Sequence, residues 1–73
     1  MTLDVAFQLL YAHEINASAS CFWDAGWTVK LGDELNGWVA VRQFENKDLG
    51  QAADWLLAEA KRAYPFLPVG SVH

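Results

Sequence analysis

The stretch from Ile15 to Phe44 limits what this chain can fold into more than any other part of it. From Ile15 to Trp23, apolar and polar side chains alternate, the pattern of a β-strand with one buried face. Two glycine-containing turn signals divide the stretch, at Asp24-Ala25-Gly26 and at Asn36-Gly37. We therefore expect an antiparallel meander, with strands at about residues 15–23, 27–32 and 38–44.

The first predicted hairpin has a turn and an apolar pattern that agree with each other. A three-residue loop ending at Gly26 would use the glycine for the left-handed conformation that such loops require. All the residues that this loop would pair lie on one face, which predicts a core containing two tryptophans and a thiol. The predicted pairs are Trp23 with Trp27, Cys21 with Val29, and Ala19 with Leu31.

The second predicted hairpin has two possible registers. A two-residue turn at Asn36-Gly37 would pair Leu35 with Trp38 and place Trp38 on the core face. That register also brings Ala40, Arg42 and Phe44 to the core face, with Arg42 opposite Leu31. A longer loop from Gly32 to Gly37 would instead bury Val39 and Val41 and leave Trp38 outside, since a one-residue slip exchanges the two faces. We prefer the Asn-Gly register, although the charge of Arg42 counts against it.

Helical periodicity flanks the meander on both sides. Apolar residues from Leu3 to Tyr11 form one stripe and predict a helix over 3–13, capped by Thr2. A second stripe predicts a helix over 48–64, with Asp48 and Gln51 as a capping box and Pro65 as the stop. The predicted fold is a single α+β domain of order α-β-β-β-α, with both helices on one face of the sheet. Residues 65–73 form a tail, in which we expect Phe66 and Leu67 to fold back and residues 70–73 to fray.

Composition excludes several classes of function. The 73 residues are 53% hydrophobic and carry a net charge of −4, which argues against direct binding of phosphate backbones. No apolar run approaches the length of a membrane span, and the N-terminus lacks the basic region of a signal peptide. We therefore expect a cytoplasmic protein without membrane contact.

The sequence shows no catalytic constellation. The histidines, His13 and His73, have no serine or cysteine nucleophile at a recognisable spacing. The single cysteine, Cys21, falls on the predicted core face, where a thiol behaves as a small hydrophobe. We expect neither an enzyme nor a requirement for a cofactor.

Three carboxylates stand at one end of the predicted sheet. Asp24 lies in the first turn, while Glu45 and Asp48 follow the third strand, which returns toward that turn. Several oxygen ligands together would make a weak site for a divalent cation. The simpler interpretation, a turn residue, a loop acid and a helix cap, is the one we prefer, and no metal site is expected.

Aromatic residues are the best candidates for binding another protein. Phe22 falls on the open face of the sheet, Trp55 lies to one side of the second apolar stripe, and the exposure of Trp38 depends on the register. Tryptophan is enriched among the residues that dominate binding energies. With two open sheet edges as well, the sequence favours a small interaction domain that binds a protein partner or forms a homodimer.

The order α-β-β-β-α over residues 3–64 resembles that of double-stranded-RNA-binding domains, which would imply nucleic-acid binding. The matching segment here, ENKDLGQAAD, has one lysine among three acids where that family has a lysine-rich motif, so this function is an alternative only.

Residues 22–57 resemble the antitoxin half of HicAB toxin–antitoxin systems, through Asp24-Ala25-Gly26, Leu31-Gly32-Asp33 and an alanine-containing helix. This likeness implies an inhibitor subunit, although the N-terminal helix does not fit. The chain is also similar to small uncharacterised bacterial and phage-type proteins, which implies no activity.

Overall fold

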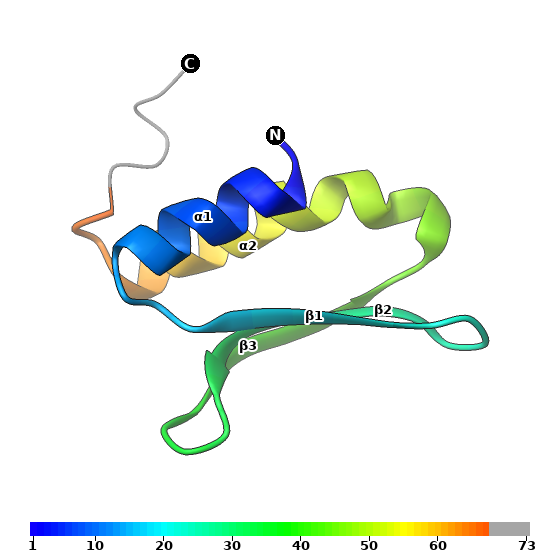
Figure 1. Ribbon diagram of the computed structural model, residues 1–73, viewed down its shortest axis with the longest axis horizontal. Helices are drawn as coiled ribbons and strands as arrows, with labels where there is room; N and C mark the ends of the chain where they lie inside the picture. The colour runs from blue at the N-terminus through cyan, green and yellow to red at the C-terminus, as the bar shows by residue number, and fades with distance from the viewer. Residues whose placement is uncertain (68–73) are drawn as a thin grey trace.

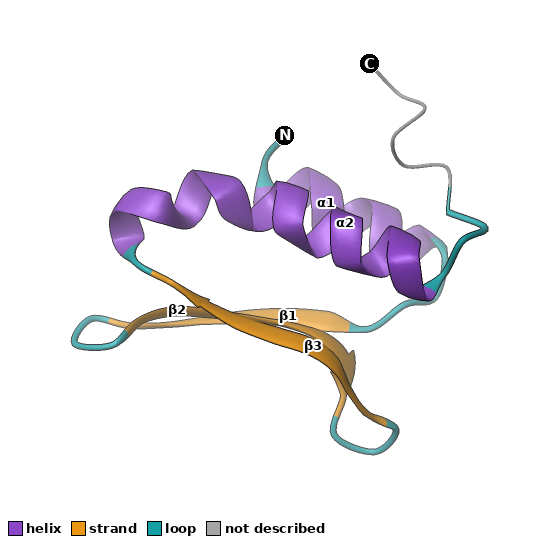
Figure 2. Ribbon diagram, turned by 180° about the vertical axis from the view of Figure 1, so that it is seen from behind, coloured by secondary structure: helices purple, strands orange, loops and turns teal. Residues whose placement is uncertain are grey.

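The computed structural model describes residues 1–67 and shows two layers, a pair of helices above a three-stranded sheet (Figure 1). The sheet is antiparallel with the order β1-β2-β3. Viewed from behind, both helices again lie on the same side of the sheet (Figure 2). The predicted α+β class and the α-β-β-β-α order are therefore confirmed. The elements are α1 (Leu3–Ala12), β1 (Ala17–Phe22), β2 (Gly26–Asp33), β3 (Gly37–Phe44), the short 3-10 helix η1 (Asn46–Gln51) and α2 (Ala52–Ala63).

The core lies between the helices and the upper face of the sheet. It contains Val29 and Leu31 of β2, which are fully buried because β2 is the central strand. Alanines on both helices allow the helices to approach closely, and the described residues include no buried polar side chain. Leu67 folds back into this core as predicted, but the same prediction for Phe66 is wrong, since Phe66 exposes 65% of its surface. The predicted fraying of residues 70–73 lies outside the described part. The buried residues are Ala6, Leu10, Ile15, Val29, Leu31, Phe44, Ala52, Ala53, Leu56, Leu57, Ala60 and Leu67.

The first hairpin has the predicted faces but not the predicted register. Ala19 faces Val29 and Cys21 faces Trp27, a shift of two residues from the predicted pairs. The chain reverses one residue earlier than expected, because the N–H of Ala25 donates to the carbonyl of Phe22 (2.9 Å). Gly26 follows this turn with φ of 91°, so the glycine has the left-handed role that was predicted for it. A shift of two residues keeps every side chain on its face.

The second hairpin follows neither predicted register. Leu31 faces Ala40, but Gly32 faces Trp38, so that Val39 is an extra residue in β3 and forms a bulge. Ala40, Arg42 and Phe44 consequently lie on the helix side, as the preferred register predicted. Trp38 is turned to the other face, as the alternative register predicted. The prediction of a two-residue turn that pairs Leu35 with Trp38 is wrong.

Glycine makes this bulge possible. Gly32 has φ of 106°, and a Cβ placed there would lie 2.9 Å from the carbonyl oxygen of Gly37 and 3.0 Å from the nitrogen of Val39. A side chain at position 32 would therefore push the two strands apart. Arg42 faces Val29 rather than Leu31 and remains exposed, with its guanidinium carbon 4.8 Å from the centre of the Phe44 ring.

The C-terminus of α1 sets the direction in which the chain enters the sheet. The N–H of Ile15 donates to the carbonyl of Leu10 (2.9 Å), and that of Glu14 donates to the carbonyl of Tyr11 (3.1 Å). This pair of bonds is the Schellman arrangement, in which Glu14 takes the left-handed position (φ 59°) usually held by glycine. Leu10 and Ile15 are both buried, which fixes the start of β1 close beneath the end of α1.

The predicted capping box at Asp48 and Gln51 is wrong. The chain already turns at Glu45, whose carbonyl accepts the N–H of Asp48 (2.9 Å), and η1 precedes α2. Asp48 therefore lies inside η1 and caps nothing. Neither residue at a cap position, Glu45 or Gln51, makes a side-chain capping bond. The second apolar stripe thus begins as a 3-10 helix and becomes an α-helix only from Ala52.

Candidate interaction surface

The face of the sheet that points away from the helices has no covering element in the described residues, and we call it the open face. The strand pairing divides it into rows, each running across the strands. No residue on the open face carries a carboxylate. In order from the first hairpin to the second, the open face consists of Phe22, then Ser20, Thr28 and Gln43, then Ser18, Lys30 and Val41, and finally Trp38.

Trp38 is held in a fixed position on the open face. The ammonium nitrogen of Lys30 lies 4.7 Å from the centre of its ring, within the range of a cation–π contact. Trp38 still exposes 41% of its surface, and Val41 in the neighbouring row exposes 50%. Together these three residues form an ordered apolar patch with a single positive charge.

Phe22 lies on the open face at the other end and exposes 61% of its surface. The polar row of Ser20, Thr28 and Gln43 separates Phe22 from the patch around Trp38. The predicted placement of Phe22 on the open face therefore agrees with the structure, and Trp38 joins it because of the bulge. Two exposed aromatic side chains thus stand on one face with hydrogen-bonding side chains between them.

Trp55 does not share this surface. It is half-buried on α2, and its ring meets that of Phe44 edge-on, with 5.8 Å between the ring centres. The predicted use of Trp55 as an exposed anchor conflicts with this packing, since the ring covers the end of the core instead. The stripe of α2 correctly placed Trp55 to one side, but the sequence did not show that β3 ends beneath it.

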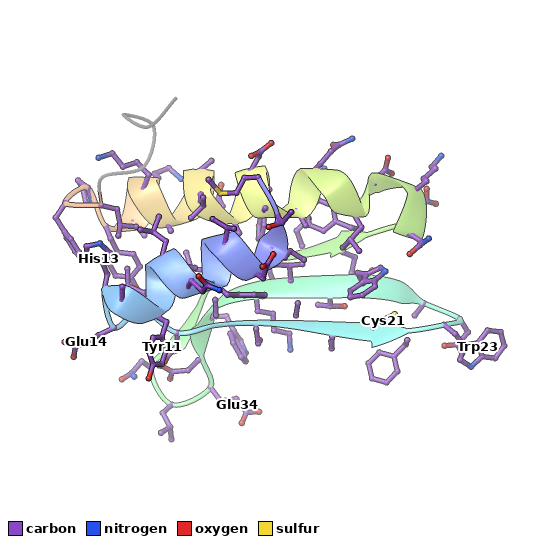
Figure 3. The ribbon with its side chains drawn as sticks, turned by 45° about the horizontal axis from the view of Figure 1, so that its top comes forward. Tyr11, His13, Glu14, Cys21, Trp23 and Glu34 are labelled. Carbon is purple, nitrogen blue, oxygen red and sulfur yellow. The ribbon has the colours of Figure 1, made fainter. Side chains whose placement is uncertain are left out.

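Trp23 is the residue whose position differs most from the one predicted. It was predicted to be a core residue paired with Trp27, but it lies in the first turn and exposes 95% of its surface. Figure 3 shows Trp23 at the outer tip of the hairpin, beyond the end of the helical layer. Its place beside Asp24-Ala25-Gly26 was the available signal, because a hairpin that closes one residue earlier puts this tryptophan in the loop.

Cys21 is also exposed, contrary to prediction. It stands on the helix side of β1, as the alternation required, but α1 ends before this point of the strand (Figure 3). Trp27, opposite Cys21, is half-buried, packs against the core, and donates its indole N–H to the side-chain oxygen of Asn46 (3.1 Å). The boundary of the core therefore runs between β1 and β2 at this end of the sheet.

A groove of 380 Å³ runs between α1 and the start of β1. It is mostly apolar, and its lining includes the half-buried Phe7 and Tyr11, which is 84% exposed. Figure 3 shows Tyr11 at the end of the molecule opposite to Trp23. The groove opens beside the free edge of β1. The residues that line it are Phe7, Gln8, Leu10, Tyr11, Ile15, Asn16 and Ala17.

The three carboxylates predicted to meet at one end of the sheet do not form a common site. Glu45 instead makes an ion pair with Lys47, with 3.4 Å between the charged atoms. Asp24 is exposed in the first turn and Asp48 lies in η1. Within residues 1–67, no three His, Cys, Asp or Glu side chains lie close enough together to hold a metal ion.

Within residues 1–67, two carboxyl groups have a lowered pKa, and both are on the surface. Hydrogen bonds from the side chain of Asn16 and from the backbone and side chain of Asn36 lower the pKa of Asp33. A hydrogen bond from the side chain of Thr2 lowers the pKa of Asp4. Thr2 precedes α1 but makes no side-chain capping bond, so this contact replaces the predicted cap. Asp33 fastens the second hairpin to the start of β1.

The comparisons with other proteins give no relative from which a role could be taken. Neither the family models, nor the curated proteins, nor the solved structures contain a match to this chain. In the described part of the chain, no helix has the length and apolar character needed to cross a membrane.

Proposed function

We propose that this chain is a small, non-catalytic interaction domain that binds another protein through the open face. The observation that carries the proposal is the ordered Trp38 ring, which is held by Lys30 and left 41% exposed on an uncovered sheet. A large ring that is already fixed in place loses little conformational entropy when a partner covers it. Phe22 provides a second anchor on the same face.

The charge distribution indicates what kind of partner fits. The open face holds Lys30 and no carboxylate, whereas the protein as a whole has a net charge of −4. Acids stand at both ends of the face, with Asp24 in the first hairpin loop and Glu34 in the second. The complementary partner has an apolar centre bordered by basic side chains, which would speed and orient association. A cytoplasmic setting is part of this proposal, since a reducing compartment suits the exposed thiol of Cys21.

A matched pair of variants tests the face directly. Val41→Glu places a charge in the middle of the open face, beside Lys30, at a side chain that is half exposed. Val5→Glu makes the same change in the first turn of α1, at a residue of nearly equal exposure, 48% against 50%. Each variant and the wild type are immobilised, and retained proteins from a cell extract are identified by mass spectrometry. The interaction of each retained protein is then measured with the purified components.

We expect one defined partner that binds the wild type and Val5→Glu equally and loses at least tenfold in affinity with Val41→Glu, about 1.4 kcal/mol. Trp38→Ala should weaken the same partner. A partner that is indifferent to Val41→Glu and to Trp38→Ala would overturn the assignment of the surface. A gel shift with double-stranded RNA at low salt would favour the alternative of nucleic-acid binding instead.

A further inference from the structure

We propose that the free edge of β1 pairs with the same edge of a second copy of this chain, and that Trp23 of each copy fills the α1–β1 groove of the other. The inference rests on the proposed function only in treating the chain as an interaction domain. It uses a different surface, the strand edge and the groove rather than the open face. The groove of each copy would thus be filled by Trp23 of the other copy.

The backbone groups of β1 are available for such pairing. The N–H of Gly32 donates to the carbonyl of Asn16 (2.7 Å), so Asn16 directs its backbone toward β2. Along an antiparallel strand these directions alternate, and the odd-numbered residues after Asn16 therefore direct their backbone groups outward. In the described residues, β2 is the only strand paired with β1. The outward residues are Ala17, Ala19 and Cys21.

The charge pattern favours a second copy at this edge. Residues 15–23 contain no charged side chain, although the chain as a whole carries a net charge of −4. Two copies can therefore meet along β1 without placing like charges opposite one another. Edge strands are commonly protected by lysine, proline or a bulge, and β1 has none of these. The other edge strand, β3, carries both the bulge and Arg42.

Strand geometry fixes a register that joins the tryptophan to the groove. Outward residues must face outward residues, so a two-fold axis at Ala19 pairs Ala17 with Cys21 of the partner. Continued by one residue past the end of β1 and to Ile15 before its start, the same register would bring Trp23 beside Ile15 of the partner, which lines the groove. The odd-numbered side chains lie on the helix side of the sheet, and the groove opens on that side. An indole that is 95% exposed in the monomer would thus enter a groove of 380 Å³.

The resulting dimer would be closed and symmetric. A two-fold axis through Ala19 and perpendicular to the sheet makes both groove contacts equivalent, so no further copy can add at β1. The two sheets become one of six strands with all helices on the same side, and the two open faces lie next to each other. A partner with two sites would gain avidity from this arrangement. A stable dimer buries about 800 Å² per protomer, which the strand pairing and two buried indoles are expected to provide together.

The first test compares two exposed apolar residues in the two hairpin loops. Trp23→Ala removes the proposed anchor, whereas Leu35→Ala alters a loop residue that is 97% exposed, against 95% for Trp23. Sedimentation equilibrium of the full chain over a wide concentration range gives the dimer dissociation constant. We expect Trp23→Ala to raise it about 30-fold or more, because the change removes both buried tryptophan anchors of the dimer. Leu35→Ala should leave it unchanged.

A second test reports the register. In the proposed dimer, position 17 faces Cys21 of the partner at about 5.5 Å between Cα atoms, within the range that a disulfide can bridge. Ala17→Cys should therefore form a disulfide-linked dimer under mild oxidation. Cys21 alone lies four residues out of register with its own copy and should not cross-link. The double variant Ala17→Cys, Cys21→Ser should not cross-link either.

The outcomes separate this inference from the proposed function. A wild type that remains monomeric at several hundred micromolar would overturn the dimer, while binding of a partner through Val41 and Trp38 could still be observed. A dimer that is indifferent to Trp23→Ala, or a wild type that cross-links through Cys21 as readily as Ala17→Cys does, would also overturn it. Loss of partner binding in Val41→Glu with an intact dimer would leave this inference standing on its own.

Discussion

The two hairpins end in loops that are equally exposed but held very differently. In the second loop, Asp33 accepts hydrogen bonds from Asn16 (2.7 Å) and from the backbone of Asn36 (2.7 Å), and so ties the loop to itself and to the chain before β1. The described contacts of the first turn consist of one backbone bond, from Ala25 to Phe22. The second loop is thus braced by side chains, and the first displays its side chains to solvent.

This difference predicts that the second hairpin matters for folding and that the tip of the first matters for the proposed association. Side-chain hydrogen bonds and Gly32, whose positive φ other residues rarely adopt, fix the position of Trp38 on the open face. Trp23 has no comparable constraint among the described contacts and lies where only another molecule could cover it. Changes in the second hairpin should therefore alter folding, whereas changes at the tip of the first should alter association alone.

The largest effect is expected at Gly32. Gly32→Ala places a Cβ 2.9 Å from the carbonyl oxygen of Gly37 at a φ of 106°. Conformational strain and the clash together should lower the free energy of unfolding by about 2–3 kcal/mol. Chemical denaturation measures this loss. The indole fluorescence of the folded state should shift as well, because the Trp38 ring would lose its contact with the ammonium group of Lys30.

Gly37→Ala is the matched control for that prediction. Gly37 has φ of 86°, but a Cβ there would meet no atom within 4 Å. Its cost should therefore be conformational only, about 1–2 kcal/mol, and smaller than that of Gly32→Ala. Equal losses for the two variants would show that the bulge can relax and that close strand contact does not hold Trp38 outside.

The bulge also explains how much of this fold could be predicted from the sequence. Alternation has a period of two, so it assigned β1 and most of β3 to the correct faces. It could not detect the two-residue shift that places Ala19 opposite Val29, because such a shift moves no side chain to the other face. Trp38 lies beyond the extra residue Val39, where the alternation is interrupted. No local pattern marks that interruption except Gly32.

The residues of the candidate site also differ in how well the sequence could place them. Phe22 could be placed from its strand alone, since the whole of β1 shares one alternation. Trp55 could not, because its burial depends on Phe44, which a tertiary contact brings beneath it from another element. Trp23 required the turn to be located to within one residue, and residues at turns are where pattern-based boundaries are least accurate.

The second prediction concerns Asp33 and acidity. Because hydrogen bonds lower the pKa of Asp33 in the folded protein, its contribution to stability is complete above its ordinary value of 3.8 and is lost as the pH falls through the lower folded value. Asp33→Asn should lower the Tm at pH 7. The difference in Tm between wild type and variant should narrow as the pH falls below about 3.8.

Glu34→Gln serves as the control for Asp33→Asn, since it removes one acid from the same exposed loop. Asp4, whose pKa is also lowered, is present in all three proteins and cancels in the comparison. Thermal melts followed by circular dichroism between pH 2.5 and 7, roughly the range over which carboxyl groups titrate, provide the measurement. A difference between wild type and Asp33→Asn that is constant over this range would contradict the role of the charged carboxylate.

A smaller effect is expected at Trp27, close to the turn of the first hairpin. Trp27→Phe removes the indole N–H that donates to Asn46 (3.1 Å) and connects β2 with η1. The loss should be about 1 kcal/mol, the usual net value of one hydrogen bond with a small change in packing. Asn46→Ala removes the other partner, and the double variant should cost less than the sum of the two single changes. Additive losses would show that this bond does not couple the hairpin to η1.

The smallest effect on folding should come from the tip of the first hairpin. Trp23 exposes 95% of its surface, so Trp23→Ser removes almost no buried area and should change the monomer's unfolding free energy by less than about 0.5 kcal/mol. The measurement belongs at low micromolar concentration, because any dimer would add stability as the concentration rises. At high concentration the wild type should melt above Trp23→Ser, whereas Leu35→Ser should follow the wild type throughout. A large loss at low concentration would mean that Trp23 packs within its own chain, and the contrast between the two loops would then fail.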